Sequence, residues 1–131
     1  MDSSSIELHG SEVESIQVED DRVVIHFSRA IIIKTLSGST ERTRWWQAGE
    51  LIFEGAEVEG EVPECPAVCA GGDVGENIYT YRDMIPVPLE SRGHAHCDLG
   101  FDGSDRRLRV QGESVKLKMD DRPRYIDHIR Q

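Results

Sequence analysis

The sequence predicts an all-β fold, either an antiparallel β-sandwich or a small barrel, with one short helix at its C-terminal end. The chain has 11 Val and 11 Ile residues against 7 Leu, 6 Ala and 3 Met. Because β-branched side chains pack well on a pleated surface and lose rotamer freedom in helices, this balance favours strands. Apolar and polar residues alternate in several stretches, and glycines stand where the alternation changes phase.

The first two strands are expected to form a hairpin. Residues 11–19 place apolar side chains among polar ones, and residues 22–33 alternate and then become continuously apolar at Ile31–Ile33. Such a run is typical of a strand that is buried on both faces. The polar residues Glu19-Asp20-Asp21 tolerate a tight backbone and are expected to form the turn.

Two later segments change phase beside a glycine. In residues 43–62 the apolar side chains move from odd to even positions across Gly55, which predicts one long bent strand or two strands. In residues 108–119 the phase changes across Gly112, which fits either a β-bulge or a tight hairpin. Lys116 and Lys118 point outward in both cases.

The length of 131 residues predicts a single domain, residues 1–131, because two cores would each bury too little surface. Residues 1–5 are expected to be flexible. Residues 63–77 hold two prolines and three glycines without a steady period, and they are expected to form a long loop. Residues 124–130, with Ile126 and Ile129 three apart, fit a short helix.

The first residues carry a resemblance to known sequences. Leu8-His9-Gly10, followed by Val13, Ile16 and the turn at Asp20-Asp21, resembles small uncharacterised bacterial all-β domains that open with a Leu-His-Asp/Gly motif. Gly10 stands where those domains more often carry Asp. The resemblance covers about the first fifth of the chain. It implies an all-β fold and transfers no catalytic residue.

Charge excludes some classes of partner. The chain has 15 Lys and Arg residues against 25 Asp and Glu, a net charge of −10. Nucleic-acid binding needs a concentrated positive surface, and no such block is present. No run of apolar residues approaches the length of a membrane span, and the start lacks the pattern of a secretory signal. We therefore expect a cytoplasmic protein that binds neither nucleic acid nor membrane. A closed homodimer is compatible with acid-rich strands.

The stretch around His94 suggests a metal site. In a strand, His94, His96 and Asp98 share one face, where two imidazoles and a carboxylate could approach one divalent metal. His-x-His on a strand also resembles the metal motif of cupins. The Glu and the later His of that motif are missing, and no histidine follows until His128. An amphipathic strand explains the same residues without a metal.

A second metal hypothesis joins Cys65 and Cys69 to the two histidines in a tetrahedral zinc site. The Cys-x3-Cys spacing is looser than the usual knuckle, so free buried thiols or an incidental disulfide are the alternative. Apart from such a divalent metal, no cofactor is expected.

Aromatic side chains provide candidate contacts for a partner. Trp45 and Trp46 are neighbours, so in a strand they face opposite ways, one into the core and one outward. The outward tryptophan could anchor a partner or lie beneath another part of the chain. Tyr79 and Tyr81 share one strand face and allow the same two interpretations.

These observations favour a non-catalytic β-sandwich that binds a protein or a small ligand. The alternative is a cupin-like or zinc-binding domain, or a metal-dependent enzyme, that uses His94, His96 and Asp98. A third alternative is a closed barrel that encloses a small apolar ligand.

Overall fold

The computed structural model describes residues 3–36 and 41–129. Within these ranges ten strands are linked by hydrogen bonds into one sheet. They are β1 (Ser3–Glu19), β2 (Arg22–Thr35), β3 (Arg42–Glu54), β4 (Glu57–Glu59), β5 (Ala67–Glu76), β6 (Tyr79–Arg82), β7 (Met84–Val87), β8 (Glu90–Phe101), β9 (Leu108–Met119) and β10 (Arg124–Ile129).

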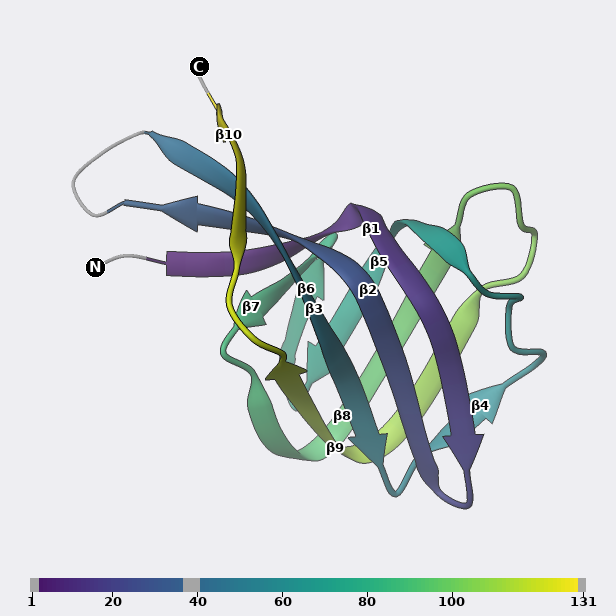
Figure 1. Cartoon of the computed structure of the whole chain (residues 1–131). Helices are drawn as coiled ribbons and strands as arrows, with labels where there is room; N and C mark the ends of the chain where they lie inside the picture. Colours follow the sequence, from purple (N-terminus) through teal and green to yellow (C-terminus); the bar gives the residue numbers. More distant parts are fainter. Residues whose placement is uncertain (1–2, 37–40, 130–131) are drawn as a thin grey trace.

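Six of the strands close into an antiparallel barrel (Figure 1). Around the barrel they follow the order β1, β2, β3, β9, β8 and β5. The circle is completed where β5 pairs with β1, through Glu12 opposite Val68 and Val13 opposite Ala67. Of the two predicted architectures, the structure is therefore the small barrel.

A projecting sheet extends from one end of the barrel (Figure 1). Strands β1, β2 and β3 have 17, 14 and 13 residues, far more than the usual five or six. Their far ends continue past the barrel, where β7 pairs with β1 and β10 pairs with β3. The order across this sheet is β7, β1, β2, β3 and β10.

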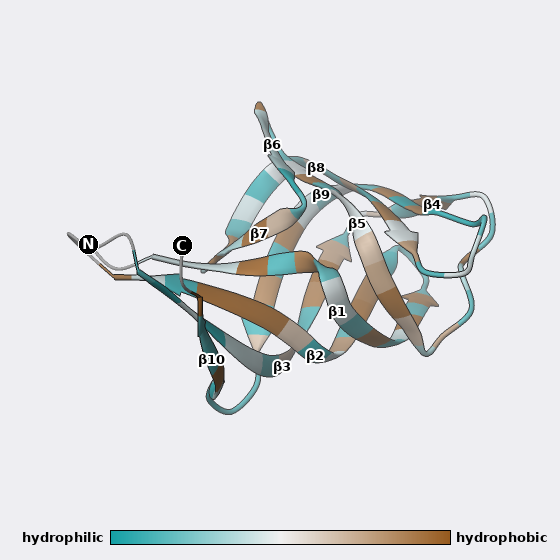
Figure 2. Cartoon of the chain, turned by 90° about the horizontal axis from the view of Figure 1, so that it is seen from above, coloured by the Kyte–Doolittle hydropathy of each residue, from teal (hydrophilic) through white to brown (hydrophobic). Residues whose placement is uncertain are grey.

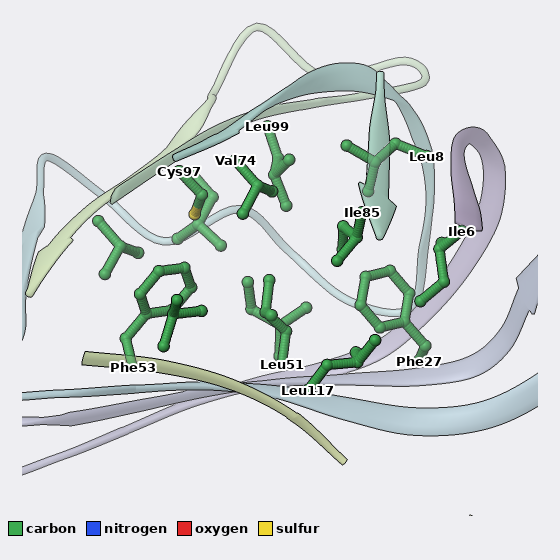
Figure 3. Close-up of a cluster of buried hydrophobic side chains, with 14 of the residues drawn as sticks. Ile6, Leu8, Phe27, Leu51, Phe53, Val74, Ile85, Cys97, Leu99 and Leu117 are labelled. Carbon is green, nitrogen blue, oxygen red and sulfur yellow. The ribbon is translucent and has the colours of Figure 1, made fainter. Parts of the chain in front are cut away.

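Apolar side chains from all six barrel strands fill the interior (Figure 3). Phe27, Leu51 and Phe53 are fully buried there. Along the strands apolar and polar residues alternate, as the hydropathy colours of Figure 2 show. In β2 the consecutive residues Ile31, Ile32 and Ile33 are all buried, which confirms the expected strand with two covered faces.

Several local predictions are confirmed. β1 and β2 form the hairpin, and Asp20 in its turn has a φ of 52°. Residues 43–62 divide into two strands, since β3 ends just before Gly55, whose φ is 59°. The phase change in β9 leaves it one continuous strand. It falls where β9 stops pairing with β3 and begins to pair with β4.

The C-terminal helix prediction is wrong, because residues 124–129 form β10. This strand hydrogen-bonds to β3 with a register shift between Tyr125 and Asp127. The shift is a β-bulge, and it produces the apolar spacing of three that imitated a helical turn.

The expected loop at 63–77 is wrong for residues 67–76, which form β5. Its glycines pack closely against β8. A Cβ at Gly72 would overlap the backbone of Asp98, and one at Gly75 would overlap the ring of His96. Of the five residues expected to be flexible, Ser3–Ser5 belong to β1, and residues 1–2 lie outside the described ranges.

Within the described ranges no helix is long and apolar enough to cross a membrane.

Leu51 tests the role of the barrel interior, since its side chain is fully buried. Replacing it (Leu51→Ala) should lower the free energy of unfolding by about 2–5 kcal/mol, because the lost methyl groups leave a cavity. The control, Lys118→Ala, changes an exposed residue of the adjacent strand and should stay within about 0.5 kcal/mol. Urea unfolding measures both, and equal losses would contradict the assignment of inner and outer faces.

Candidate binding surfaces

The histidine strand presents its polar residues on the outer wall of the barrel. On β8, Ala95 and Cys97 are buried in the interior, and His94, His96 and Asp98 point the other way, as predicted. The ring centroids of His94 and His96 are 5.5 Å apart, with planes tilted by 30°. The two rings line an open groove of about 260 Å³ together with residues of β4 and β9.

Asp98 is held by two arginines rather than left available to a cation. Its carboxylate accepts hydrogen bonds from Arg107 Nε at 2.7 Å and from Arg109 Nε at 3.5 Å. Partial burial acts to raise the pKa of Asp98, but the hydrogen bonds and charges of the two arginines outweigh it. The pKa therefore lies below its ordinary value.

His96 covers the backbone of the neighbouring strand. It lies opposite Gly75 on β5, and its ring occupies the space that a side chain at Gly75 would need. The Nδ1 atom of His96 is buried and has no hydrogen-bond partner among the described residues. An aromatic ring over a strand glycine shields the backbone from water, so His96 contributes to packing.

The structure does not assemble either predicted metal site. Within residues 3–36 and 41–129 no three His, Cys, Asp or Glu side chains gather as a cation would require. Cys69 belongs to the buried core, whereas His94 and His96 lie on the outer wall. Cys65 is half-buried just before β5.

All three cysteines are free thiols. Burial raises the pKa of Cys65, and it raises that of Cys97, which is almost fully enclosed. Burial is also the main cause of the raised pKa of Cys69, with a smaller contribution from the carboxylates of Asp83 and Asp102. Since the thiolate is the reactive form, the raised pKa makes each thiol less reactive at neutral pH than a free cysteine.

The two tryptophans lie on opposite faces of the projecting sheet, as predicted. Trp45 packs against the core, with Tyr125 of β10 edge-on at 5.3 Å and Lys34 Nζ 4.5 Å from its ring. Trp46 lies on the other face, with the Arg124 guanidinium 5.2 Å from its ring. Both rings are half-buried, and each contacts the β10 side chain that lies opposite it in the pairing, so they help to attach that strand.

The two tyrosines differ in exposure. Tyr81 packs against the core, and burial together with the nearby charge of Glu76 raises its pKa. Tyr79 is 58% exposed, and its neighbour Ile78 is 88% exposed. We call Ile78 and Tyr79 the apolar tip. Figure 2 shows β6 and its turn standing away from the barrel wall.

Asn77 fixes this turn to β8. Its backbone N–H donates to the carbonyl oxygen of His94 at 2.6 Å, and its side-chain amide donates to Ser91 and to the carbonyl of Arg92, each at 3.1 Å. The side chain fills the space beside Gly93, whose φ is 111°. The sequence does not single out Asn77, which falls within the expected loop at residues 63–77, or Ile78, the residue after it. The strand-turn-strand pattern around Asn77 was the available signal.

Comparisons with protein-family models, with curated proteins and with solved structures found no match. The resemblance at Leu8-His9-Gly10 therefore stays a prediction.

Because the pKa of Asp98 is lowered, we expect the stability of the fold to depend on pH. Because its folded pKa is lowered, the stabilisation is present above the carboxyl pKa of the unfolded chain and is lost as pH falls through the folded pKa. Asp98→Asn should lower the free energy of unfolding at pH 7 by about 0.5–1 kcal/mol, a small value because solvent screens a side chain that is 38% exposed. The difference from wild type should shrink as pH falls and close once Asp98 is protonated in the folded protein as well.

Urea unfolding across this pH range provides the measurement. Asp105→Asn, on the exposed β8–β9 connection, is the matched control and should show no such gap. A gap that persists in acid would show that Asp98 acts through packing rather than charge.

The cysteines should differ in reactivity. Cys65 is half-buried, whereas Cys69 and Cys97 are buried. A disulfide reagent at pH 8 should therefore modify one thiol readily in the folded protein and all three after denaturation. A Cys65→Ser variant should lose the rapid phase. Rapid modification of all three native thiols would contradict the placement of Cys69 and Cys97 in the core.

Proposed function

We propose that this protein is a non-catalytic binding domain that contacts another protein through the apolar tip. The observation that carries the proposal is the exposure of Ile78, 88%, in the two-residue turn between β5 and β6, and of Tyr79, 58%, at the start of β6. Turn positions usually hold Gly, Asn, Asp or Ser, because those residues tolerate the backbone and favour water. A large apolar side chain at this position contributes little to folding, so its contribution is expected in a complex.

The turn is held in one position before any partner arrives. Three hydrogen bonds from Asn77 join it to β8, and β6 pairs with β5 over its whole length. A fixed contact surface loses less conformational entropy on binding than a mobile loop. Aromatic and aliphatic side chains that enter a pocket of the partner are the usual anchors of protein interfaces.

The other aromatic residues that the sequence offers as partner contacts are less exposed than the apolar tip. The rings of Trp45 and Trp46 are half-buried and contact side chains of β10, and Tyr81 packs against the core. Tyr79 is therefore the member of the predicted set with the most open side chain for a partner, and Ile78 enlarges its apolar surface.

A photo-crosslinking residue at position 78 tests the proposal in the cells that produce the protein. It should give a discrete protein adduct, and Tyr79→Ser should reduce its yield several-fold.

Ile78→Ser should change the free energy of unfolding by less than about 0.5 kcal/mol, because the side chain is already exposed. Asn77→Ala should lower both stability, by about 1–2 kcal/mol, and crosslinking, because the turn loses its two side-chain hydrogen bonds to β8.

The matched control carries the same crosslinker at Val18, which is 46% exposed near the β1–β2 turn. The same adducts from both positions, or no adduct from position 78, would refute the apolar tip as the contact site.

A further inference from the structure

A second site lies on the outer face of the projecting sheet, where β1, β2, β3 and β10 run side by side. It is an open pocket of about 270 Å³. Its lining side chains are Glu7, His9, Arg29, Ile31, Arg44 and Ile126, with Gly10 at one edge. Because three irregular strand segments surround it, we call it the three-bulge pocket.

Each of the three segments contributes lining residues. In β1 the register with β2 shifts between Glu7 and Glu12, and His9 and Gly10 come from this bulge. In β2 the register with β3 shifts between Phe27 and Ala30, which places Arg29 at the pocket. In β10 the shift between Tyr125 and Asp127 places Ile126 there. Bulges re-aim side chains and are over-represented beside functional sites.

The β1 bulge is a built feature of the fold. The fully buried Ser11 hydroxyl donates to the carbonyl oxygen of Glu7 at 2.6 Å and accepts from the Ile31 N–H at 3.0 Å. These bonds satisfy backbone groups that the bulge takes out of the ladder. Gly10 has a φ of 89°, and a Cβ there would meet no atom within 4 Å. The bulge therefore leaves open space at Gly10, which also lines the pocket.

The pocket combines three kinds of surface. Ile31, 8% exposed, and Ile126 form an apolar floor. Arg29 and Arg44 are the cationic side chains of the lining and Glu7 is the anionic one, while the carboxylates of Glu12 and Asp127 lie against the two arginines.

Each arginine retains capacity for a further anion. Arg29 Nη1 lies 3.8 Å from a carboxylate oxygen of Glu12, and Arg44 Nη1 lies 3.2 Å from one of Asp127. Among the described residues, each guanidinium pairs with a carboxylate through its Nη1 atom, and it has five N–H donors in all. Both side chains are partly exposed, 41% and 37%, so a ligand can reach them. A carboxylate is the group that this donor geometry recognises.

We propose that the three-bulge pocket binds an aliphatic α-amino acid in its zwitterionic form. Its carboxylate is received by Arg29 and Arg44, its ammonium group by Glu7, and its side chain by Ile31 and Ile126. The inference goes beyond the proposed protein contact and does not depend on it, because the apolar tip belongs to a different pair of strands, β5 and β6.

The pocket is open to solvent, so we expect a dissociation constant near about 1 mM for a small ligand. Leucine has three matched analogues, each lacking one of the groups that the pocket would recognise. Glycine lacks the side chain, 4-methylpentanoate lacks the ammonium group, and isopentylamine lacks the carboxylate.

Titration of the isotope-labelled protein with these four compounds, followed by NMR, tests the proposal. Leucine should shift the signals of Ile31 and Ile126 in a saturable way, and each analogue should bind about ten-fold more weakly or worse. The proposal is overturned if leucine gives no saturable shift up to about 50 mM. It is also overturned if the four compounds bind equally, or if the shifts centre on another surface.

Variants assign each charge to its partner. Glu7→Gln should bind leucine and 4-methylpentanoate equally, because the ammonium group no longer has its carboxylate. Arg44→Gln should reduce the preference for leucine over isopentylamine several-fold, because one of the two guanidinium groups that receive the carboxylate is lost. If the loss of the Asp127 contact unfolds that variant, Arg29→Gln replaces it with the same expectation. Glu14→Gln, an exposed change elsewhere on β1, is the control and should leave all four affinities unchanged. Variants that keep the wild-type ratios of affinities would refute the assignment.

Discussion

The pairing of β5 with β1 is the contact on which the rest of the structure depends. It closes six strands into a barrel and turns the inner face of each strand into a shared core. β1 also extends past the barrel to pair with β7. One part of β1 therefore belongs to the barrel and another part to the projecting sheet, which runs in a different direction. A regular strand cannot follow both paths, and the bulge held by Ser11 provides the change of direction.

Charge on the outer wall is organised by pairing. The chain is strongly acidic, yet several of its arginines lie against carboxylates: Arg107 on Asp98, Arg106 on Glu61 and Arg44 on Asp127. These pairs are partly exposed, so each contributes little to stability. Together they determine which charged side chains can still bind a ligand. Asp98 is withdrawn from metal chemistry by its arginines, and Glu7 retains a place beside a cationic surface.

Two-residue alternation is sufficient to predict the structural features that are set by residues close together in the chain. The β1–β2 hairpin, the break at Gly55, the phase change in β9 and the shared face of the histidines all follow from two-residue alternation. Alternation failed in β5, where glycines fit against β8, and in β10, where a bulge spaced the isoleucines like a helix. The partners of Asp98 and the three-bulge pocket depend on register between distant segments, and a sequence pattern carries no information about that register.

The place of β9 in the barrel affects how the chain folds during synthesis. β9 joins β3 to β8, yet among the barrel strands it comes last in the chain. Until the ribosome has released residues 108–119, β3 and β8 each retain an unpaired edge, and the apolar faces around Phe53 and Leu99 lack a partner strand. A nascent chain that has not yet released β9 therefore exposes these edges to aggregation, and its barrel closes only after β9 has been synthesised.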